Sequence, residues 1–218
     1  MKSLPKNIKC LCFDLDNTLI DRNKAYSTYL EKAFEFVNQP KIWAENKTRI
    51  LEFDNKGYKS REIFYQWLIS EFMHQKLFEE FQKKYVVGDF VEKVDTEIIT
   101  TLMALKEHYH LVLLTNGGNH NQQKKIVNSG LYKIFPPSST FISGDYSFEK
   151  PNPMFFKLIQ MQYGYTPDEI VMIGDDYDKD IVGAHQLGWP TIHLNEKKID
   201  ASMASVQIKN IQEIALYL

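Results

Sequence analysis

The chain has 218 residues, of which 44% are hydrophobic and 25% are charged, and its formal net charge is −2. This composition is ordinary for a globular protein, and the length allows one large domain or two small ones. The near-neutral charge and the lack of a long basic run argue against a nucleic-acid partner, and no apolar stretch approaches the roughly 20 residues that a membrane span needs.

The first predicted strand is residues 9–15, "KCLCFDL", and it contains both cysteines of the chain, Cys10 and Cys12. Two positions apart on a strand, they share a face and point the same way, which is a poor geometry for a disulfide. No His or Cys partner stands nearby, so we expect buried, reduced thiols in preference to a metal site. Lys6 and Lys9 interrupt the region where a signal peptide would be apolar. These features favour a cytoplasmic protein.

A helical block follows the first strand. Apolar residues recur there at spacings of three and four, which predicts helices with one buried face. Pro40 follows the first stripe of apolar residues and is expected to end the first helix. A second helix is expected over 41–54. Ser60 is a candidate cap for a third helix, whose apolar face carries Ile63, and a fourth is expected over 75–87. The first stripe consists of Tyr26, Tyr29, Leu30, Ala33, Phe34 and Val37, and the third of Ile63, Phe64, Trp67, Leu68 and Phe72.

From residue 96 onward, predicted helices and strands alternate. Helices are expected over 96–108 and 120–129, between the later strands and from about residue 210. Strands are expected at 110–115, 140–143, 169–174 and 190–194. Such alternation predicts an α/β fold with a doubly wound parallel sheet. The helical block reads as an insertion, so we expect an α/β core at 1–18 and 93–218 and an α-helical cap at 19–92.

Polar side chains follow the strands at the edge where ligands bind in open parallel sheets. Two carboxylates follow the first strand, and a hydroxyl and a glycine turn stand at the end of the second. A lysine follows the third strand, and further carboxylates follow the fourth. Such a set suits a divalent metal and a phosphate. The residues are Asp14 and Asp16, then Thr115, Asn116 and Gly117, then Lys150, then Asp175, Asp176 and Asp180.

These residue types suit phosphoryl transfer. One carboxylate can act as a nucleophile and form an acyl phosphate, which splits a difficult displacement into two easier ones. A second carboxylate can protonate the leaving oxygen and then deprotonate the attacking water. Two like charges 4 Å apart repel by about 4 kcal/mol at an effective dielectric constant of 20. A shared Mg²⁺ would reverse the sign of that interaction.

Four segments, "DLDNT", "LLTNG", the lysine of "EKPNP" and "IGDDYDKDIVGA", resemble the four motifs of the haloacid-dehalogenase-like phosphohydrolases, and they stand in the family's order. A helical cap inserted after the first strand is also a family feature, so the resemblance covers the whole chain. It implies a Rossmann-like core. The branch that it most resembles has a small helical cap and contains phosphoglycolate phosphatases and nucleotidases.

Carried over position by position, the resemblance implies that Asp14 is the nucleophile and Asp16 the general acid and base. Asp14 and Asp175 would bind Mg²⁺ through their carboxylates and Asp16 through its main-chain carbonyl. Lys150 would neutralise the nucleophile and the transferring group.

The remaining motif residues receive supporting roles. The resemblance implies that Thr115, Asn116 and Gly117 hold the substrate phosphate together with Lys150. Three further residues are expected to support the metal ligands without binding the ion: Thr18, Asp176 and Asp180. For Asp180, a direct bond to the metal is also possible.

The function expected from this reading is a Mg²⁺-dependent phosphatase that forms an aspartyl phosphate. Its partner would be a small phosphorylated metabolite such as a sugar phosphate, a nucleoside monophosphate or phosphoglycolate. The cap would close over the substrate and exclude water. We expect a monomer or a homodimer.

Three alternatives stay open. A phosphosugar mutase of the β-phosphoglucomutase type shares all four motifs. A 2-haloacid dehalogenase typically lacks the second aspartate and needs no metal, so Asp16 and Asp175 argue against it. A non-catalytic binding protein could have kept the fold.

Overall fold

The computed structural model describes residues 4–195 and 202–218, and the chain divides into two compact units. The first unit comprises Met1–Asp21 and Glu92–Leu218, and the second is Arg22–Val91. The first contains every β-strand of the described residues, whereas the second is helical. That these units serve as catalytic core and cap stays a prediction.

The α/β unit is built on one six-stranded sheet in which all strands are parallel. The strand order is β3-β2-β1-β4-β5-β6, so the chain winds first to one side of β1 and then to the other. This confirms the predicted doubly wound fold. The strands are β1 (Cys10–Phe13), β2 (His110–Thr115), β3 (Thr140–Ile142), β4 (Ile170–Gly174), β5 (Thr191–Leu194) and β6 (Val206–Ile208).

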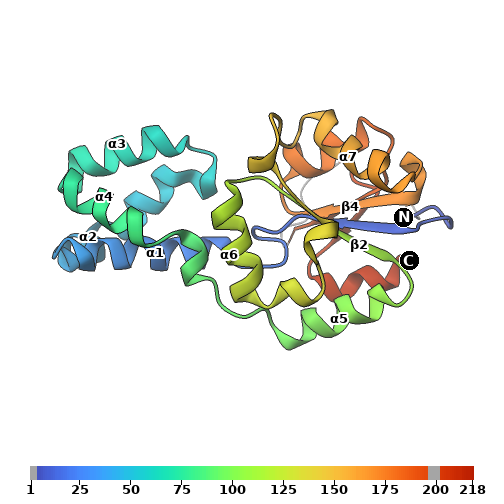
Figure 1. Cartoon of the computed structure of the whole chain (residues 1–218), viewed down its shortest axis with the longest axis horizontal. Helices are drawn as coiled ribbons and strands as arrows, with labels where there is room; N and C mark the ends of the chain where they lie inside the picture. Colours follow the sequence, from blue (N-terminus) through green and yellow to red (C-terminus); the bar gives the residue numbers. More distant parts are fainter. Residues whose placement is uncertain (1–3, 196–201) are drawn as a thin grey trace. The chain divides into compact units, whose positions relative to one another are not determined.

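Helices cover both faces of this sheet, with α5 (Thr96–Lys106) and α7 (Pro153–Tyr163) on opposite sides (Figure 1). The unit also contains α6 (Asn119–Ser129), the short α8 (Gly183–His185) and several short 3₁₀ helices, the longest of which is Ile211–Leu216. Cys10 and Cys12 lie in the core that α7 covers, and both are free buried thiols as expected.

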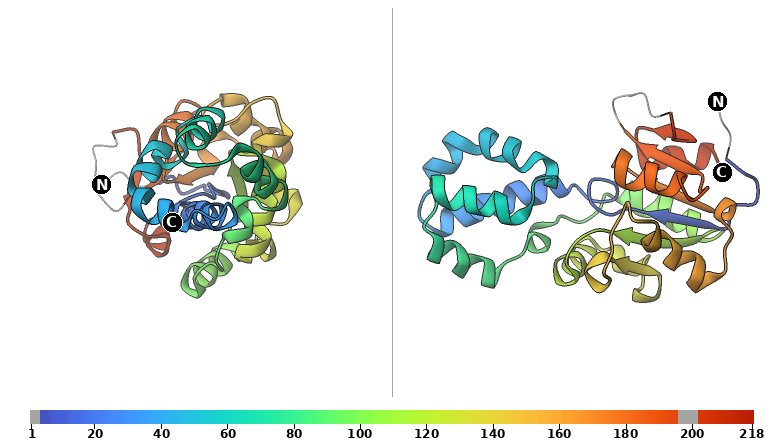
Figure 2. Two further views of the ribbon diagram at one scale, coloured as in Figure 1. Left: turned by 90° about the vertical axis from the view of Figure 1, so that its left-hand side faces the viewer. Right: turned by 90° about the horizontal axis from the view of Figure 1, so that it is seen from above.

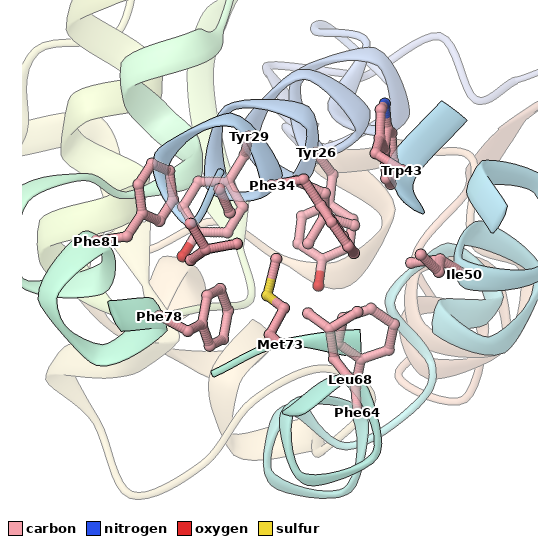
Figure 3. Close-up of a cluster of buried hydrophobic side chains, with 13 residues drawn as sticks. Tyr26, Tyr29, Phe34, Trp43, Ile50, Phe64, Leu68, Met73, Phe78 and Phe81 are labelled. Carbon is pink, nitrogen blue, oxygen red and sulfur yellow. The ribbon is translucent and has the colours of Figure 1, made fainter. Parts of the chain in front are cut away.

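The α-helices of the helical unit surround a common interior (Figures 2 and 3); they are α1 (Arg22–Phe36), α2 (Pro40–Asp54), α3 (Arg61–Phe72) and α4 (Gln75–Lys84). Side chains from all four helices point into it (Figure 3). The six residues of the first predicted stripe are all buried there. Aromatic rings dominate, and a typical pair is Tyr29 and Phe81, whose centroids lie 5.1 Å apart. A small helical unit needs such bulk to bury enough surface.

Several local predictions were wrong. Pro40 does not stop a helix but begins α2, where its missing N–H is not needed. Ser60 is the N-cap residue of α3 as expected, although its side chain makes no capping hydrogen bond. Ile63 is half exposed, because the α3 face that packs inward is centred on Phe64 and Leu68.

Other differences concern element ends. β1 is shorter than predicted, because the chain turns directly after it: the N–H groups of Leu19 and Ile20 both donate to the Leu15 carbonyl. The helix after β4 starts as a π-helical turn, Tyr177–Val182, and β6 was not predicted at all. Of the helices in the described part of the chain, none combines the length and apolar character needed to cross a bilayer.

The helical unit also contains a buried ion cluster. Asp54 accepts hydrogen bonds from Arg22 Nη1 at 2.9 Å and from Arg61 Nη1 at 2.6 Å. Both guanidinium groups lie over the ring of Tyr26, at 4.3 and 4.6 Å from its centroid. The Arg61 Nη1 atom also donates to the Tyr26 hydroxyl at 2.6 Å. One carboxylate therefore holds two cations against one aromatic ring.

We expect Asp54→Asn to lower the free energy of unfolding by about 2 to 3 kcal/mol, because it leaves a nearly buried guanidinium without its counter-charge. The half-exposed Arg61 side chain keeps the loss below that of a fully buried pair. Urea unfolding measures it. The matched control is Glu71→Gln, which removes the exposed partner of Arg49 and should change stability by less than about 1 kcal/mol. Equal effects of the two substitutions would contradict a special role for Asp54.

Candidate active site

The carboxyl ends of the three central strands bring most of the predicted residues together. β1 pairs with β2 on one side and β4 on the other, so the residues after these strands are neighbours at one edge. Asp14 stays fixed to β4 because its N–H donates to the Ile173 carbonyl at 2.9 Å. The chain then reverses through Asn17, which has a φ of 61° and is a residue type that tolerates this left-handed conformation. Asp14 and Asp16 therefore flank the start of a tight turn.

Lys150 links two of the aspartates. Its Nζ atom lies 2.6 Å from Asp14 Oδ1 and 2.7 Å from Asp180 Oδ1, and all three side chains are buried. The second oxygen of Asp180 accepts the Asp176 N–H at 3.2 Å. Gly174 leaves room for this carboxylate, since a Cβ there would lie 2.1 Å from Asp180 Oδ2. The glycine that ends β4 is thus a requirement of the site.

The charges of this cluster do not balance. Burial raises the pKa of Asp14 and of Asp180, and the attraction of Lys150 only partly opposes it. Burial and the nearby Asp14 raise the pKa of Asp175 to about 7. For Lys150, burial acts to lower the pKa, but Asp14 and Asp180 outweigh it and the pKa is raised. Three carboxylates thus face one ammonium, an excess of two negative charges when all are ionised.

Asp175 is held from two sides. Thr18 Oγ1 donates to Asp175 Oδ1 at 3.2 Å, and the Asp175 N–H points back to the same hydroxyl at 3.1 Å. Behind it, His193 Nε2 lies 3.0 Å from the Asp175 carbonyl oxygen. Burial lowers the pKa of His193, which favours the neutral ring with its N–H on Nε2. Thr18 was expected beside the metal site, whereas His193 was not singled out, because a histidine in a strand has no spacing signal.

The residues after β2 make mainly internal contacts. Asn116 Nδ2 donates to the Lys150 carbonyl at 2.8 Å, and the Lys150 N–H donates to Asn116 Oδ1 at 2.9 Å. The Gly117 N–H donates to Ser143 Oγ at 2.9 Å. The Asn116 side chain therefore fixes the main chain that carries Lys150. The phosphate-binding roles of Asn116 and Gly117 stay predictions.

Asp16 faces α6 and is bound by two side chains that the sequence reading did not single out. Lys125 Nζ lies 2.7 Å from both carboxylate oxygens, and Gln122 Nε2 lies 3.1 Å from Oδ2. Gln122 Nε2 also donates to Thr115 Oγ1 at 2.7 Å. A signal was present in the sequence. Gln122 and Lys125 each stand four positions before Ile126 and Ser129, respectively, so all four lie on the buried face of α6.

Asp176 has a local role. Its Oδ1 accepts the Lys179 N–H at 3.0 Å, as an N-cap does, and its Oδ2 lies 3.4 Å from Lys179 Nζ. It supports the turn that carries Asp180. Its neighbour Asp178 is exposed.

The acidic group fits a small divalent cation. Asp14, Asp175 and Asp180 each offer a carboxylate oxygen, and these atoms all lie within 4.8 Å of one another. Hard oxygen donors are what Mg²⁺ prefers, and its charge would match the excess negative charge. The predicted carboxylate ligands Asp14 and Asp175 are both in this group. The Asp16 side chain does not belong to this group, and binding of Mg²⁺ by its main-chain carbonyl stays a prediction.

Comparison with known proteins gives matches over most of the chain. The sequence model of a family described as haloacid dehalogenase-like hydrolase matches residues 11–194. A glyceraldehyde 3-phosphate phosphatase of Methanopyrus kandleri is 28% identical over 210 residues, covering 88% of this chain and 85% of that protein. The pyrimidine 5'-nucleotidase PynA of Streptococcus pneumoniae is 26% identical over 207 residues, covering 88% and 86%.

A solved structure matches nearly the whole fold. The putative HAD-hydrolase YfnB of Bacillus subtilis, bound to magnesium, superposes with a TM-score of 0.76 at 22% identity and covers 97% of this chain and 98% of that one. At this identity the likeness shows a shared fold.

Proposed function

The chain belongs to the haloacid dehalogenase-like hydrolases, and from that premise we propose that it is a Mg²⁺-dependent phosphatase of small phosphomonoesters. The observation that carries this proposal is the buried cluster in which Lys150 bridges Asp14 and Asp180 beside Asp175. It places at one sheet edge a carboxylate that could act as the nucleophile, a fixed cation, and carboxylate oxygens that could bind Mg²⁺. Relatives named as phosphatases and as a nucleotidase support the same reaction class.

The reaction assigns one task to each side chain. Lys150 bonds Asp14 Oδ1, and we assign the attack on phosphorus to Asp14 Oδ2. The bond from phosphorus to the leaving oxygen breaks, and Asp16 gives that oxygen a proton. Water then attacks the aspartyl phosphate while Asp16 accepts its proton, which frees phosphate and restores Asp14.

Charge on the transferring group is stabilised by fixed groups. Lys150 contributes the ammonium, and the Thr115 hydroxyl contributes a hydrogen bond. When bound by Asp14, Asp175 and the Asp16 carbonyl, Mg²⁺ would neutralise further negative charge on the phosphoryl oxygens. Asp180 would hold Lys150 in place, and the Thr18 hydroxyl would orient Asp175.

The substrate is proposed to be a small phosphorylated metabolite, with glyceraldehyde 3-phosphate and pyrimidine nucleoside monophosphates first on the panel because relatives carry those names. A sugar phosphate and phosphoglycolate complete it. The free thiols of Cys10 and Cys12 support a reducing compartment, and we propose the cytoplasm. A monomer or homodimer stays the prediction for the assembly.

A phosphate-release screen with Mg²⁺ tests this function. We expect turnover of p-nitrophenyl phosphate and of at least one metabolite of the panel, its loss in EDTA, and its return when Mg²⁺ is added. Asp14→Asn supplies the blank. Absence of phosphate release from every compound would overturn the proposal, and conversion of a sugar phosphate into its isomer without free phosphate would point to a mutase.

A further inference from the structure

We propose that Lys125 and Gln122 of α6 are positioning residues that hold the Asp16 carboxylate where it transfers its protons and that tie it to the phosphate-binding hydroxyl of Thr115. This inference rests on the proposed phosphatase function, in which Asp16 is the acid and base. It assigns a catalytic support role to a helix outside the four motifs.

The contacts leave the Asp16 carboxylate little freedom. Lys125 Nζ lies 2.7 Å from each of its oxygens, and Gln122 Nε2 adds a third contact at 3.1 Å. The donors are themselves fixed, because the Lys125 side chain is 4% exposed and Gln122 is 1% exposed. The Asp16 side chain is 25% exposed, so without these donors it would be free to turn toward solvent.

The ammonium of Lys125 also offsets the repulsion between the two aspartates at the strand end. The negative charge of Asp16 is one cause of the raised pKa of Asp14. A buried lysine is stable only when it is paired, and here Asp16 supplies a counter-charge. The pairing thus keeps two carboxylates close together while each has its own ammonium, Lys150 for Asp14 and Lys125 for Asp16.

Gln122 joins the acid and base to the phosphate site. Its amide nitrogen carries two hydrogens, one for Asp16 Oδ2 and one for Thr115 Oγ1. The Thr115 hydroxyl accepts this bond, and its own hydrogen makes only a long contact, 3.5 Å, with the Asn116 carbonyl oxygen, so it can turn to a better acceptor in the site. Gly117 makes room for the amide: a Cβ there would lie 3.1 Å from Gln122 Cδ, and its φ of 135° suits glycine alone. The geometry therefore fixes Asp16 relative to the Thr115 hydroxyl, which the proposed function places against the substrate phosphate.

Lys125→Met tests this role with p-nitrophenyl phosphate. The nitrophenolate leaves without a proton, so the first step, which kcat/KM reports, does not need Asp16. Hydrolysis of the aspartyl phosphate does need it. We expect kcat to fall about 10-fold or more, because a misplaced base loses much of its effect. The value of kcat/KM should stay within about 3-fold of wild type, so KM falls with kcat.

A second substrate supplies the complementary result. With 2-glycerol phosphate the leaving alkoxide must be protonated, so Lys125→Met should lower kcat/KM itself by about 10-fold or more. Gln122→Met should act in the same direction. Lys125→Arg keeps the cation and should keep more activity than Lys125→Met. The matched controls are Lys157→Met and Gln123→Met, which change exposed residues and should leave both substrates unaffected.

A double-mutant comparison separates positioning from a merely structural role. In an Asp16→Asn background, Lys125→Met should cause no further fall in kcat for p-nitrophenyl phosphate, since the residue it acts through is already inactive. An additive fall, or an equal loss of kcat and kcat/KM in the single variant, would overturn the inference. So would wild-type kinetics in the Lys125→Met protein. Failure of the proposed function would look different, because the wild-type protein would then release no phosphate at all.

Discussion

Asp14→Asn should reduce phosphate release by about 10⁴-fold or more, the largest effect that we expect from a single substitution. The amide keeps the size of the side chain, and its oxygen can still accept the hydrogen bond of Lys150. It lacks the negative charge and the second oxygen that attack on phosphorus requires. Steady-state phosphate release with Mg²⁺ and p-nitrophenyl phosphate measures the loss.

The control for this experiment makes the same chemical change at Asp178, an exposed residue of the fourth motif. Asp178→Asn removes an exposed charge of the turn after β4, and we expect activity within about 2-fold of wild type. If Asp14→Asn kept a tenth or more of the wild-type rate, Asp14 would not be the nucleophile and the assigned mechanism would be wrong.

Lys150→Met should have the second largest effect, on both activity and stability. It removes the one ammonium that bridges Asp14 and Asp180, and it leaves both carboxylates buried without that partner. We expect phosphate release to fall by about 10³-fold. In EDTA the free energy of unfolding should fall by about 3 to 5 kcal/mol, as for other buried ion pairs that lose one member.

The pH dependence of this loss has a definite sign. Burial raises the folded-state pKa of both Asp14 and Asp180 even with Lys150 present. Removing the Lys150 ammonium should raise both pKa values further, because its attraction lowers them. A carboxyl group whose pKa is higher in the folded state binds more protons there, so its contribution to stability falls as pH rises. Urea unfolding should therefore show a smaller deficit at pH 5.5 than at pH 8. Lys157→Met, on an exposed position of α7, is the control, and a deficit independent of pH would contradict the account.

The strand-end motifs were predictable because they depend on topology more than on packing detail. Once the helix and strand alternation indicates a parallel sheet, the residues after β1, β2 and β4 must meet at one edge. Asp14, Thr115 and Asp175 could be placed there from the sequence for that reason. The loop carrying Lys150 reaches the same edge, and the Asn116 side chain that fixes its main chain could not be foreseen, because that contact depends on the loop conformation.

The support from α6 is a different case. Its helical spacing alone puts Gln122 and Lys125 on the face of Ile126, but a polar helix with few apolar residues gives no reason to trust that face. The contacts with Asp16 give a reason for polar side chains at these buried positions. In the helical unit the aromatic spacing predicted the first buried stripe well. It misplaced Ile63, since in α3 apolar residues stand on both sides of the helix.

The central claim is that Asp14 accepts the phosphoryl group, and trapping the intermediate tests it most directly. Asp16→Asn should still react with p-nitrophenyl phosphate, whose leaving group needs no proton, but should hydrolyse the resulting acyl phosphate slowly. Rapid acid quenching, borohydride reduction and peptide mass analysis would then locate the modified residue. We predict a stoichiometric burst of p-nitrophenol and conversion of Asp14 to homoserine. A phosphoryl group on any other residue, or phosphate release with no covalent intermediate, would contradict the mechanism.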